Sequence, residues 1–130
     1  MRVSMQINKI KATNIEMTEA IKQYVEEKML SLDKLTTHFG SAASLDIEVG
    51  RETEHHQKGP IFKCEVNLQI PGKVVRVDVT DEDLYAAIDK AKDLLRDRLA
   101  EEKDAMIERR RQAGEEVELG EPSVDEEFNP

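Results

Sequence analysis

Apolar and polar residues alternate along several short stretches of the chain, a pattern typical of strands that bury one face. Pro71 and Gly72 form a tight turn signal between two of these stretches, and the Gly-Pro pair at 59–60 marks a loop. We predict four strands, from about 3 to 10, 45 to 49, 61 to 70 and 75 to 79.

Two longer stretches carry apolar residues at helical spacing. The first is predicted to run from about 19 to 36, after Thr18, which is a good N-cap residue. The second is predicted to run from about 82 to 112 and to end at Gly114. At the start of this second helix, Thr80 with an acidic residue three positions later resembles a capping box.

These elements follow one another in the order β-α-β-β-β-α, which predicts an α+β fold. The connection through the first helix favours parallel pairing of the first two strands, and the turns that follow favour antiparallel pairing. We therefore expect a four-stranded mixed sheet with both helices on one face. The last three strands and the second helix also repeat the end of a double-stranded-RNA-binding domain, so the fold is predicted to be similar to that domain.

The net charge of −9 is concentrated at the C-terminal end of the chain. Residues 114–130 hold seven acidic side chains and no Lys or Arg, which leaves 19 basic against 21 acidic residues in 1–113, a net charge of −2. We predict one α+β domain over 1–113 and an acidic, disordered tail over 114–130, because the tail has too little apolar surface to fold. For a nucleic-acid partner, the arrangement of charges on the domain then matters more than the total.

The sequence contains none of the common motifs of catalysis or cofactor binding. It has no Gly-rich phosphate loop, no Cys pair, no Gly-x-Ser-x-Gly and no His-Glu-x-x-His. His55 and His56 are predicted to belong to a polar loop, since no further metal ligands are evident. Cys64 shares a face with Val66 and Leu68, which predicts a buried, unreactive thiol. We expect a protein that is not an enzyme and that has no metal or cofactor.

The chain also lacks the signals of a membrane or secreted protein. No apolar run is long enough to span a bilayer, and the N-terminus has no signal-peptide core. The single cysteine points to a reducing compartment. A cytoplasmic location is predicted.

The second helix separates its side chains by type around its axis. Its predicted core stripe consists of Leu84, Ile88, Ala91, Leu95 and Leu99. One flank of that stripe is basic with a tyrosine at its start, and it consists of Tyr85, Lys92, Arg96, Lys103 and Arg110. Such a row suits a phosphate backbone, and the ring can stack on a base or sugar. The alternative is that these residues pair with the acids grouped on the outward side, which include Asp89 and Asp93, as on any charged surface.

The first helix has one lysine in an unusual place. Lys28 falls inside the apolar arc that includes Ile21 and Val25. Burial of a lysine is costly, so one interpretation is that the side chain snorkels past the edge of the sheet into water. The other is that the lysine is held at the rim of the domain and points at a ligand. Lys22 and Lys34 lie elsewhere on the same helix.

The segment 83–89, and the segment 14–25 with its continuation to 34, resemble the ribosome hibernation promoting factors. This family includes ribosome-associated inhibitor A, or protein Y, and was formerly labelled sigma-54 modulation protein. The segment 83–89, Asp-Leu-Tyr-Ala-Ala-Ile-Asp, is similar to the family motif Asp-Met/Leu-Tyr-x-Ala-Ile. The segment 14–25 and its continuation to 34 resemble the first helix of the family. The resemblance covers about residues 3 to 103.

The resemblance implies a ribosome-associated translation inhibitor that binds between the head and body of the small subunit. There it would contact 16S ribosomal RNA and ribosomal proteins in the decoding channel. It would block messenger RNA and the A- and P-site transfer RNAs, and silence translation under starvation or stress. We expect no membrane, small-molecule substrate or cofactor to be involved, and a monomer off the ribosome.

The expected contacts with ribosomal RNA follow from the resemblance and from the basic row. Basic residues of the first helix match basic positions of the family. On the second helix the family commonly has basic residues where this chain has Leu94 and Asp97, and here the basic residues lie next to those places. The predicted RNA-binding residues are Lys22, Lys28, Lys34, Tyr85, Lys92, Arg96, Arg98 and Lys103.

The acidic tail is similar to that of the short, tailed members of the family, which are associated with idle single ribosomes rather than ribosome pairs. Two other functions stay open. A generic double-stranded-RNA-binding module would bind naked duplex RNA in a salt-sensitive way. A protein-interaction adaptor would act through the tail and would survive loss of every lysine named above.

Overall fold

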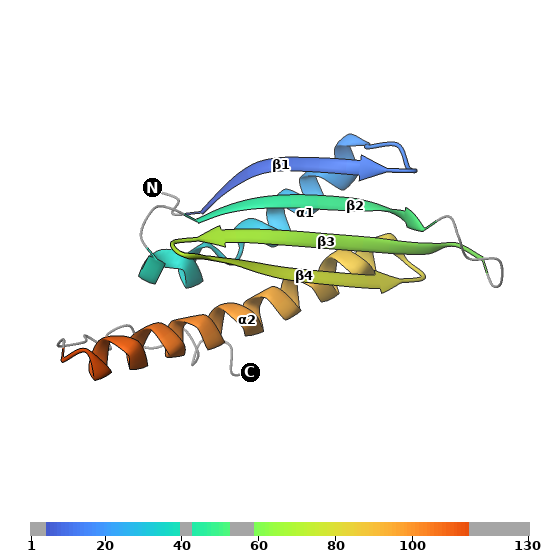
Figure 1. Ribbon diagram of the computed structural model, residues 1–130. Helices are drawn as coiled ribbons and strands as arrows, with labels where there is room; N and C mark the ends of the chain where they lie inside the picture. Colours follow the sequence, from blue (N-terminus) through green and yellow to red (C-terminus); the bar gives the residue numbers. More distant parts are fainter. Residues whose placement is uncertain (1–4, 40–42, 53–58, 115–130) are drawn as a thin grey trace, which may run out of the picture.

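A four-stranded sheet forms one of the two layers of the protein (Figure 1). The computed structural model describes residues 5–39, 43–52 and 59–114. β1 is parallel to β2, and the other two neighbouring pairs are antiparallel. The predicted mixed sheet is therefore confirmed. Its strands, in spatial order, are β1 (Met5–Thr13), β2 (Ala43–Glu52), β3 (Ile61–Ile70) and β4 (Lys73–Asp81).

The sheet buries one face because its strands alternate apolar and polar residues. In β3, Cys64, Val66 and Leu68 are fully buried, while the residues between them stay partly exposed. The opposite face is polar and carries cross-strand ion pairs, such as Lys63 with Glu48 at 3.5 Å. The same alternation continues into β2 and β4, whose buried residues include Leu45, Ile47, Val49, Val75 and Val77.

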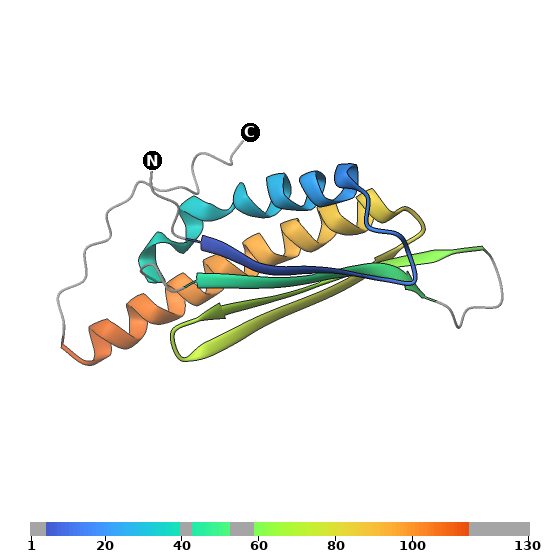
Figure 2. The same cartoon turned by 90° about the horizontal axis from the view of Figure 1, so that it is seen from above.

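Both α-helices lie on the apolar face of the sheet, as predicted (Figure 2). α1 spans Glu19–Leu30 and α2 spans Leu84–Gln112. α2 packs against β3 and β4, and α1 contacts both α2 and β1. Among the described residues, no helix has an apolar stretch of the length needed to cross a membrane. The predicted core stripe of α2 is confirmed, since all of its members are buried: Leu84, Ile88, Ala91, Leu95 and Leu99.

The first α-helix is shorter than predicted. It ends at Leu30, and the chain continues as a 3-10 helix, η1 (Asp33–Phe39). The carboxylate of Asp33 accepts a hydrogen bond of 2.8 Å from the backbone N–H of Met5, at the start of β1. The buried Thr36 hydroxyl bonds back to the carbonyl of Asp33 at 2.8 Å, three residues earlier, which suits the tighter helix. The predicted continuation of the α-helix to Thr36 is therefore wrong.

The helix ends confirm two of three predicted caps. The Thr18 hydroxyl accepts a first-turn N–H of α1 at 3.1 Å, and Gly114 follows α2 with a φ of 85°. The start of α2 differs from the prediction. Its N-cap is Asp83, whose carboxylate accepts the N–H of Ala86 at 3.2 Å. The capping box predicted to begin at Thr80 is wrong, because Thr80 still belongs to β4.

Substituting Asp83→Ala should lower the free energy of unfolding by about 1 kcal/mol, because the first turn of α2 loses its side-chain acceptor. Thr80→Ala is the matched control. Its side chain is exposed, so it should change the free energy of unfolding by less than about 0.5 kcal/mol. Urea denaturation measures both values, and equal losses would contradict the assignment of Asp83 as the cap.

Candidate RNA-binding surface

The basic row predicted on α2 lies at the border between the buried stripe of the helix and water. We call Lys92, Arg96 and Lys103 the basic flank. They lie within about 40° of one another around the helix axis, since successive residues turn by about 100°. The side chains of Lys92 and Arg96 are 22% and 33% exposed, and Lys103 is also partly exposed. Such side chains cover apolar surface with their stems while their charges reach water.

Two residues of the basic flank lie close to an acid of the same helix. Lys92 Nζ is 3.6 Å from Asp93 Oδ1, and a guanidinium nitrogen of Arg96 is 3.9 Å from the same oxygen. The alternative prediction, pairing with neighbouring acids, is therefore met in part. Partly exposed pairs of this kind contribute about 0 to 1 kcal/mol, so a phosphate can replace the carboxylate at little cost. Surface pairing and RNA binding are compatible here.

A cluster of four side chains joins α1 to α2. We call Tyr24, Lys28, Tyr85 and Asp89 the interhelix cluster. The Tyr24 hydroxyl donates a hydrogen bond of 2.7 Å to Asp89 Oδ1, and Lys28 Nζ lies 3.6 Å from the same oxygen. The Lys28 ammonium is also 5.3 Å from the centroid of the Tyr24 ring. The rings of Tyr24 and Tyr85 meet edge to face, with their centroids 4.7 Å apart.

Sequence reasoning missed the role of Asp89 in this cluster. The wheel placed Asp89 among the outward acids, because α1 could not be positioned beside it. The pKa of Tyr24 is raised to about 12, first by the hydrogen bond to Asp89, then by burial and by the negative charge of Asp89. The phenol therefore keeps its proton at neutral pH. One signal was present in the sequence: Asp89 follows Tyr85 by four residues, so the two side chains are neighbours on the helix surface.

Lys28 reaches water at the boundary between the two helices and not past the edge of the sheet. Its side chain is 36% exposed, so it snorkels, but its charge meets Asp89 of α2 on the way out. The apolar arc of α1 therefore includes a residue that contacts α2. That Lys28 also points at a ligand stays a prediction.

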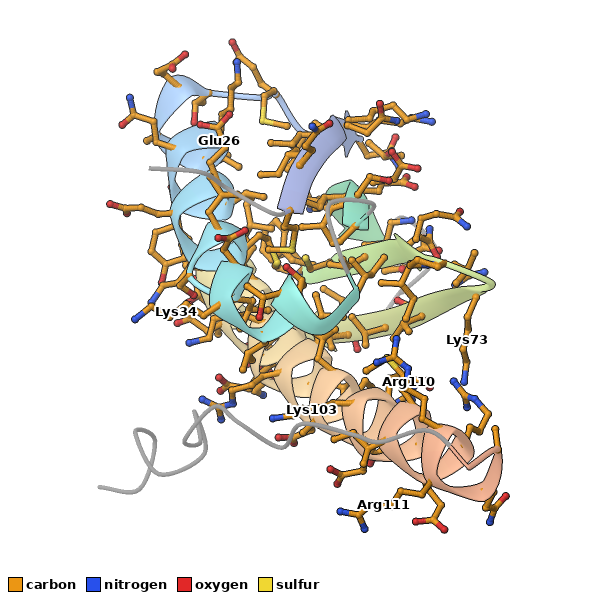
Figure 3. All side chains as sticks on the ribbon, turned by 90° about the vertical axis from the view of Figure 1, so that its left-hand side faces the viewer. Glu26, Lys34, Lys73, Lys103, Arg110 and Arg111 are labelled. Carbon is orange, nitrogen blue, oxygen red and sulfur yellow. The ribbon has the colours of Figure 1, made fainter. Side chains whose placement is uncertain are left out.

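The structure brings some of the predicted RNA-binding residues together and separates others. Figure 3 places Lys34 and Lys103 on the flank where η1 borders α2, and Tyr85 at the start of the same helix is 36% exposed. Arg98 follows Arg96 by two residues, or about 200° of rotation, so it lies on another side of α2. Lys22 precedes Tyr24 by two residues, which is also about 200° of rotation. It therefore lies on the side of α1 away from the interhelix cluster.

Cys64 lies in the core of the domain. Burial, with smaller contributions from the charges of Asp78 and Glu65, raises the pKa of its thiol to about 12. The predicted burial of this thiol is confirmed. Among the described residues, no group of three or more His, Cys, Asp or Glu is placed to hold a metal ion. His55, His56 and most of the tail lie outside these residues, and what was expected of them stays a prediction.

Residues 8–107 match the family described as Sigma 54 modulation protein / S30EA ribosomal protein. The chain belongs to this family. The matched segment includes α1, η1, all but the first residues of the sheet and most of α2. The basic flank and the interhelix cluster therefore both lie within the family domain.

Relatives in two bacteria carry names that refer to ribosome hibernation. The chain is 35% identical over 109 residues to the Ribosome hibernation promotion factor of Deinococcus radiodurans, covering 83% of this chain and 54% of that protein. It is 33% identical over 105 residues to the Ribosome hibernation promoting factor of Azotobacter vinelandii, covering 81% and 89%. The chain spans about half the length of the first relative and most of the second.

Two solved structures are similar to this domain. The N-terminal domain of Protein Y from Thermus thermophilus is 35% identical, with a TM-score of 0.56, over 72% of this chain and 94% of that one. A ribosomal subunit interface protein from Coxiella burnetii has a TM-score of 0.62 over 76% and 98%, at 14% identity, which shows a shared fold alone. Neither tests the predicted likeness to a double-stranded-RNA-binding domain.

Proposed function

We propose that this protein is a ribosome-associated translation inhibitor, a hibernation factor of the cytoplasm with no enzymatic step. It binds the small subunit in the decoding channel, through 16S ribosomal RNA and ribosomal proteins. There it blocks messenger RNA and the A- and P-site transfer RNAs under stress. The observation that carries the proposal is the family match over residues 8–107, supported by relatives named for ribosome hibernation.

The chemistry of the helical side supports an RNA partner. The basic flank can neutralise phosphates, and the exposed ring of Tyr85 can stack on a base or sugar. The outer face of the sheet also carries cations beside acids, since Lys63 contacts Glu48 and Arg76 contacts Glu65, but both tyrosines of the chain lie on the helices. We therefore assign the RNA to the side of the helices.

The protein should co-sediment with small subunits and intact ribosomes when a stationary-phase lysate is run through a sucrose gradient. Binding to a dense phosphate field releases counterions, so the bound fraction should fall as salt rises. A protein that stays at the top of a low-salt gradient, with ribosomes in excess, would show the proposed function to be wrong. Equal binding to ribosomes and to naked duplex RNA would favour a generic RNA-binding module.

Replacing the basic flank by Lys92→Gln, Arg96→Gln and Lys103→Gln should weaken ribosome binding and keep the fold. Each lost phosphate contact should flatten the log–log salt dependence of binding by roughly 0.7 to 0.9. Each substitution should change the free energy of unfolding by less than about 0.5 kcal/mol, because the side chains lie outside the core stripe.

The matched control for the flank variant is Lys9→Gln with Lys11→Gln, which removes exposed charges of β1 from the outer face of the sheet. Per charge removed, it should change the salt dependence less than the flank variant does. Filter binding with purified ribosomes, over a series of salt concentrations, measures both slopes. If the two variants have the same effect per charge, the RNA lies on a different surface.

Truncating the chain after Gln112 should leave its affinity for naked RNA equal or slightly higher, because the seven carboxylates of the tail repel phosphate. On the ribosome the tail is proposed to lie along the messenger path. Truncation should therefore weaken translation inhibition or permit ribosome pairing while the domain still binds. A full-length variant with the seven acids changed to their amides is the control for length. Identical behaviour of truncated and intact protein in both assays would remove the tail from the mechanism.

A further inference from the structure

Asp89 contacts two residues of α1, which an acid on the outward side of α2 would not do. Its Oδ1 atom receives the Tyr24 hydroxyl at 2.7 Å and lies 3.6 Å from Lys28 Nζ, so one oxygen joins two residues of α1 to α2. Among the described residues, Asp89 is the one acid within ion-pair distance of Lys28. The centroid of the Tyr24 ring lies 5.3 Å from Lys28 Nζ, so the ring borders a second side of the ammonium. Lys28 is therefore restrained by both a charge and a ring.

Lys28 is nevertheless still accessible. Its side chain is 36% exposed and that of Asp89 is 46% exposed, so the ion pair opens to water at the surface between the helices. A lysine ammonium has three N–H donors, and the carboxylate at 3.6 Å does not use all of them. A phosphate that arrives at this surface can share the ammonium with Asp89, provided that it arrives from the open side.

We propose that Asp89 is a positioning residue that makes the RNA-binding surface selective for the ribosome over other duplex RNA. It holds the Lys28 ammonium at one place between α1 and α2, and it balances the lysine's charge until a phosphate occupies the open side. The inference rests on the proposed function and adds to it the residue that sets its specificity.

The physical reason is the difference between a free and a held lysine. A free lysine has a flexible stem and follows any phosphate backbone, which raises affinity without regard to sequence or shape. A lysine beside a carboxylate attracts an arbitrary backbone weakly, because the acid repels the same phosphates. The held ammonium contributes fully only to an RNA surface whose phosphates match its position. Asp89 thus lowers non-specific binding more than specific binding.

Asp89→Asn tests this directly, because the amide oxygen can still accept the Tyr24 hydrogen bond while the charge that holds Lys28 is lost. Asp104→Asn is the matched control. Asp104 is an exposed acid of the same helix, and it makes no hydrogen bond or ion pair among the described residues. Both variants are compared with the unmodified protein for binding to purified small subunits and to a naked RNA duplex of unrelated sequence, over a series of salt concentrations.

Relative to Asp104→Asn, the Asp89→Asn variant should bind the naked duplex more tightly, with a log–log salt slope steeper by roughly 0.7 to 0.9, as expected for one released lysine. Its affinity for small subunits should rise less than its affinity for the naked duplex. The preference for ribosomes over duplex should fall roughly three- to tenfold. Equal preferences for the two variants would overturn the proposal.

A second comparison shows whether Asp89 acts through Lys28. When Lys28→Gln is already present, adding Asp89→Asn should change binding no more than adding Asp104→Asn. A loss of preference that persists without the lysine would assign the effect to Asp89 itself and overturn the inference.

A third comparison does not depend on the folding of any Asp89 variant. Lys28→Gln should weaken binding to small subunits more than binding to duplex, whereas Lys22→Gln, which removes a lysine outside the interhelix cluster, should weaken both alike. Equal effects of the two lysines would contradict the proposal.

The failure of this inference differs from a failure of the proposed function. An unmodified protein that does not bind ribosomes overturns both. If the unmodified protein binds ribosomes but Asp89→Asn and Asp104→Asn are indistinguishable, only the role of Asp89 is overturned.

Discussion

One face of the sheet is apolar, and the burial of its β3 and β4 side chains beneath α2 is the interaction on which the rest of the molecule depends. The core stripe of α2 is buried, and the helix packs against β3 and β4. Cutting a large buried side chain of such a core to alanine costs about 2 to 5 kcal/mol, whereas an exposed ion pair contributes about 0 to 1 kcal/mol. Burial of the apolar stripe therefore sets the rotation of α2 about its axis, and the positions of its charged residues follow from that rotation.

The rotation of α2 determines which of its side chains face α1. With its apolar stripe on the sheet, α2 turns Tyr85 and Asp89 toward Tyr24 and Lys28, and the basic flank continues along the same border toward η1. The helices are thus joined through aromatic and charged groups. A boundary of this kind stays partly open to water, so its cations remain within reach of a ligand while the domain keeps its stability elsewhere.

The sequence could predict those features that depend on local periodicity. Alternation located the four strands, and the spacing of the leucines in α2 identified its core stripe. Periodicity also explains the error at Thr36, since Leu32, in the turn between α1 and η1, and Thr36, within η1, are both buried at the spacing expected of an α-helix. The sequence pattern could not contain the hydrogen bond from Met5 N–H to Asp33 at the start of η1, because it is a contact across 28 positions of the chain.

The candidate site shows the same limit. A wheel places Tyr85 and the basic flank on one side of α2, because their relation depends on a single helix. The bonds of Asp89 depend on the angle and distance between two helices, which no pattern within either one contains. Lys28 was the partial exception: a lysine inside an apolar arc indicated that its charge had to reach water or a ligand, without showing that it would meet an aspartate of α2.

The charge of the whole chain bears on how such a surface can select its partner. With a net charge of −9, and −2 over residues 1–113, the protein has little long-range attraction for RNA. At physiological ionic strength, screening limits the reach of each exposed charge to about 8 Å. Binding must then come from short-range matches between individual cations and individual phosphates. A protein with an excess of lysines would gain affinity for every RNA in the cell. In a nearly neutral domain, the positions of a few cations decide which RNA is bound, and the total charge matters less. An acid such as Asp89 beside Lys28 contributes to this selectivity because it fixes the position of the lysine.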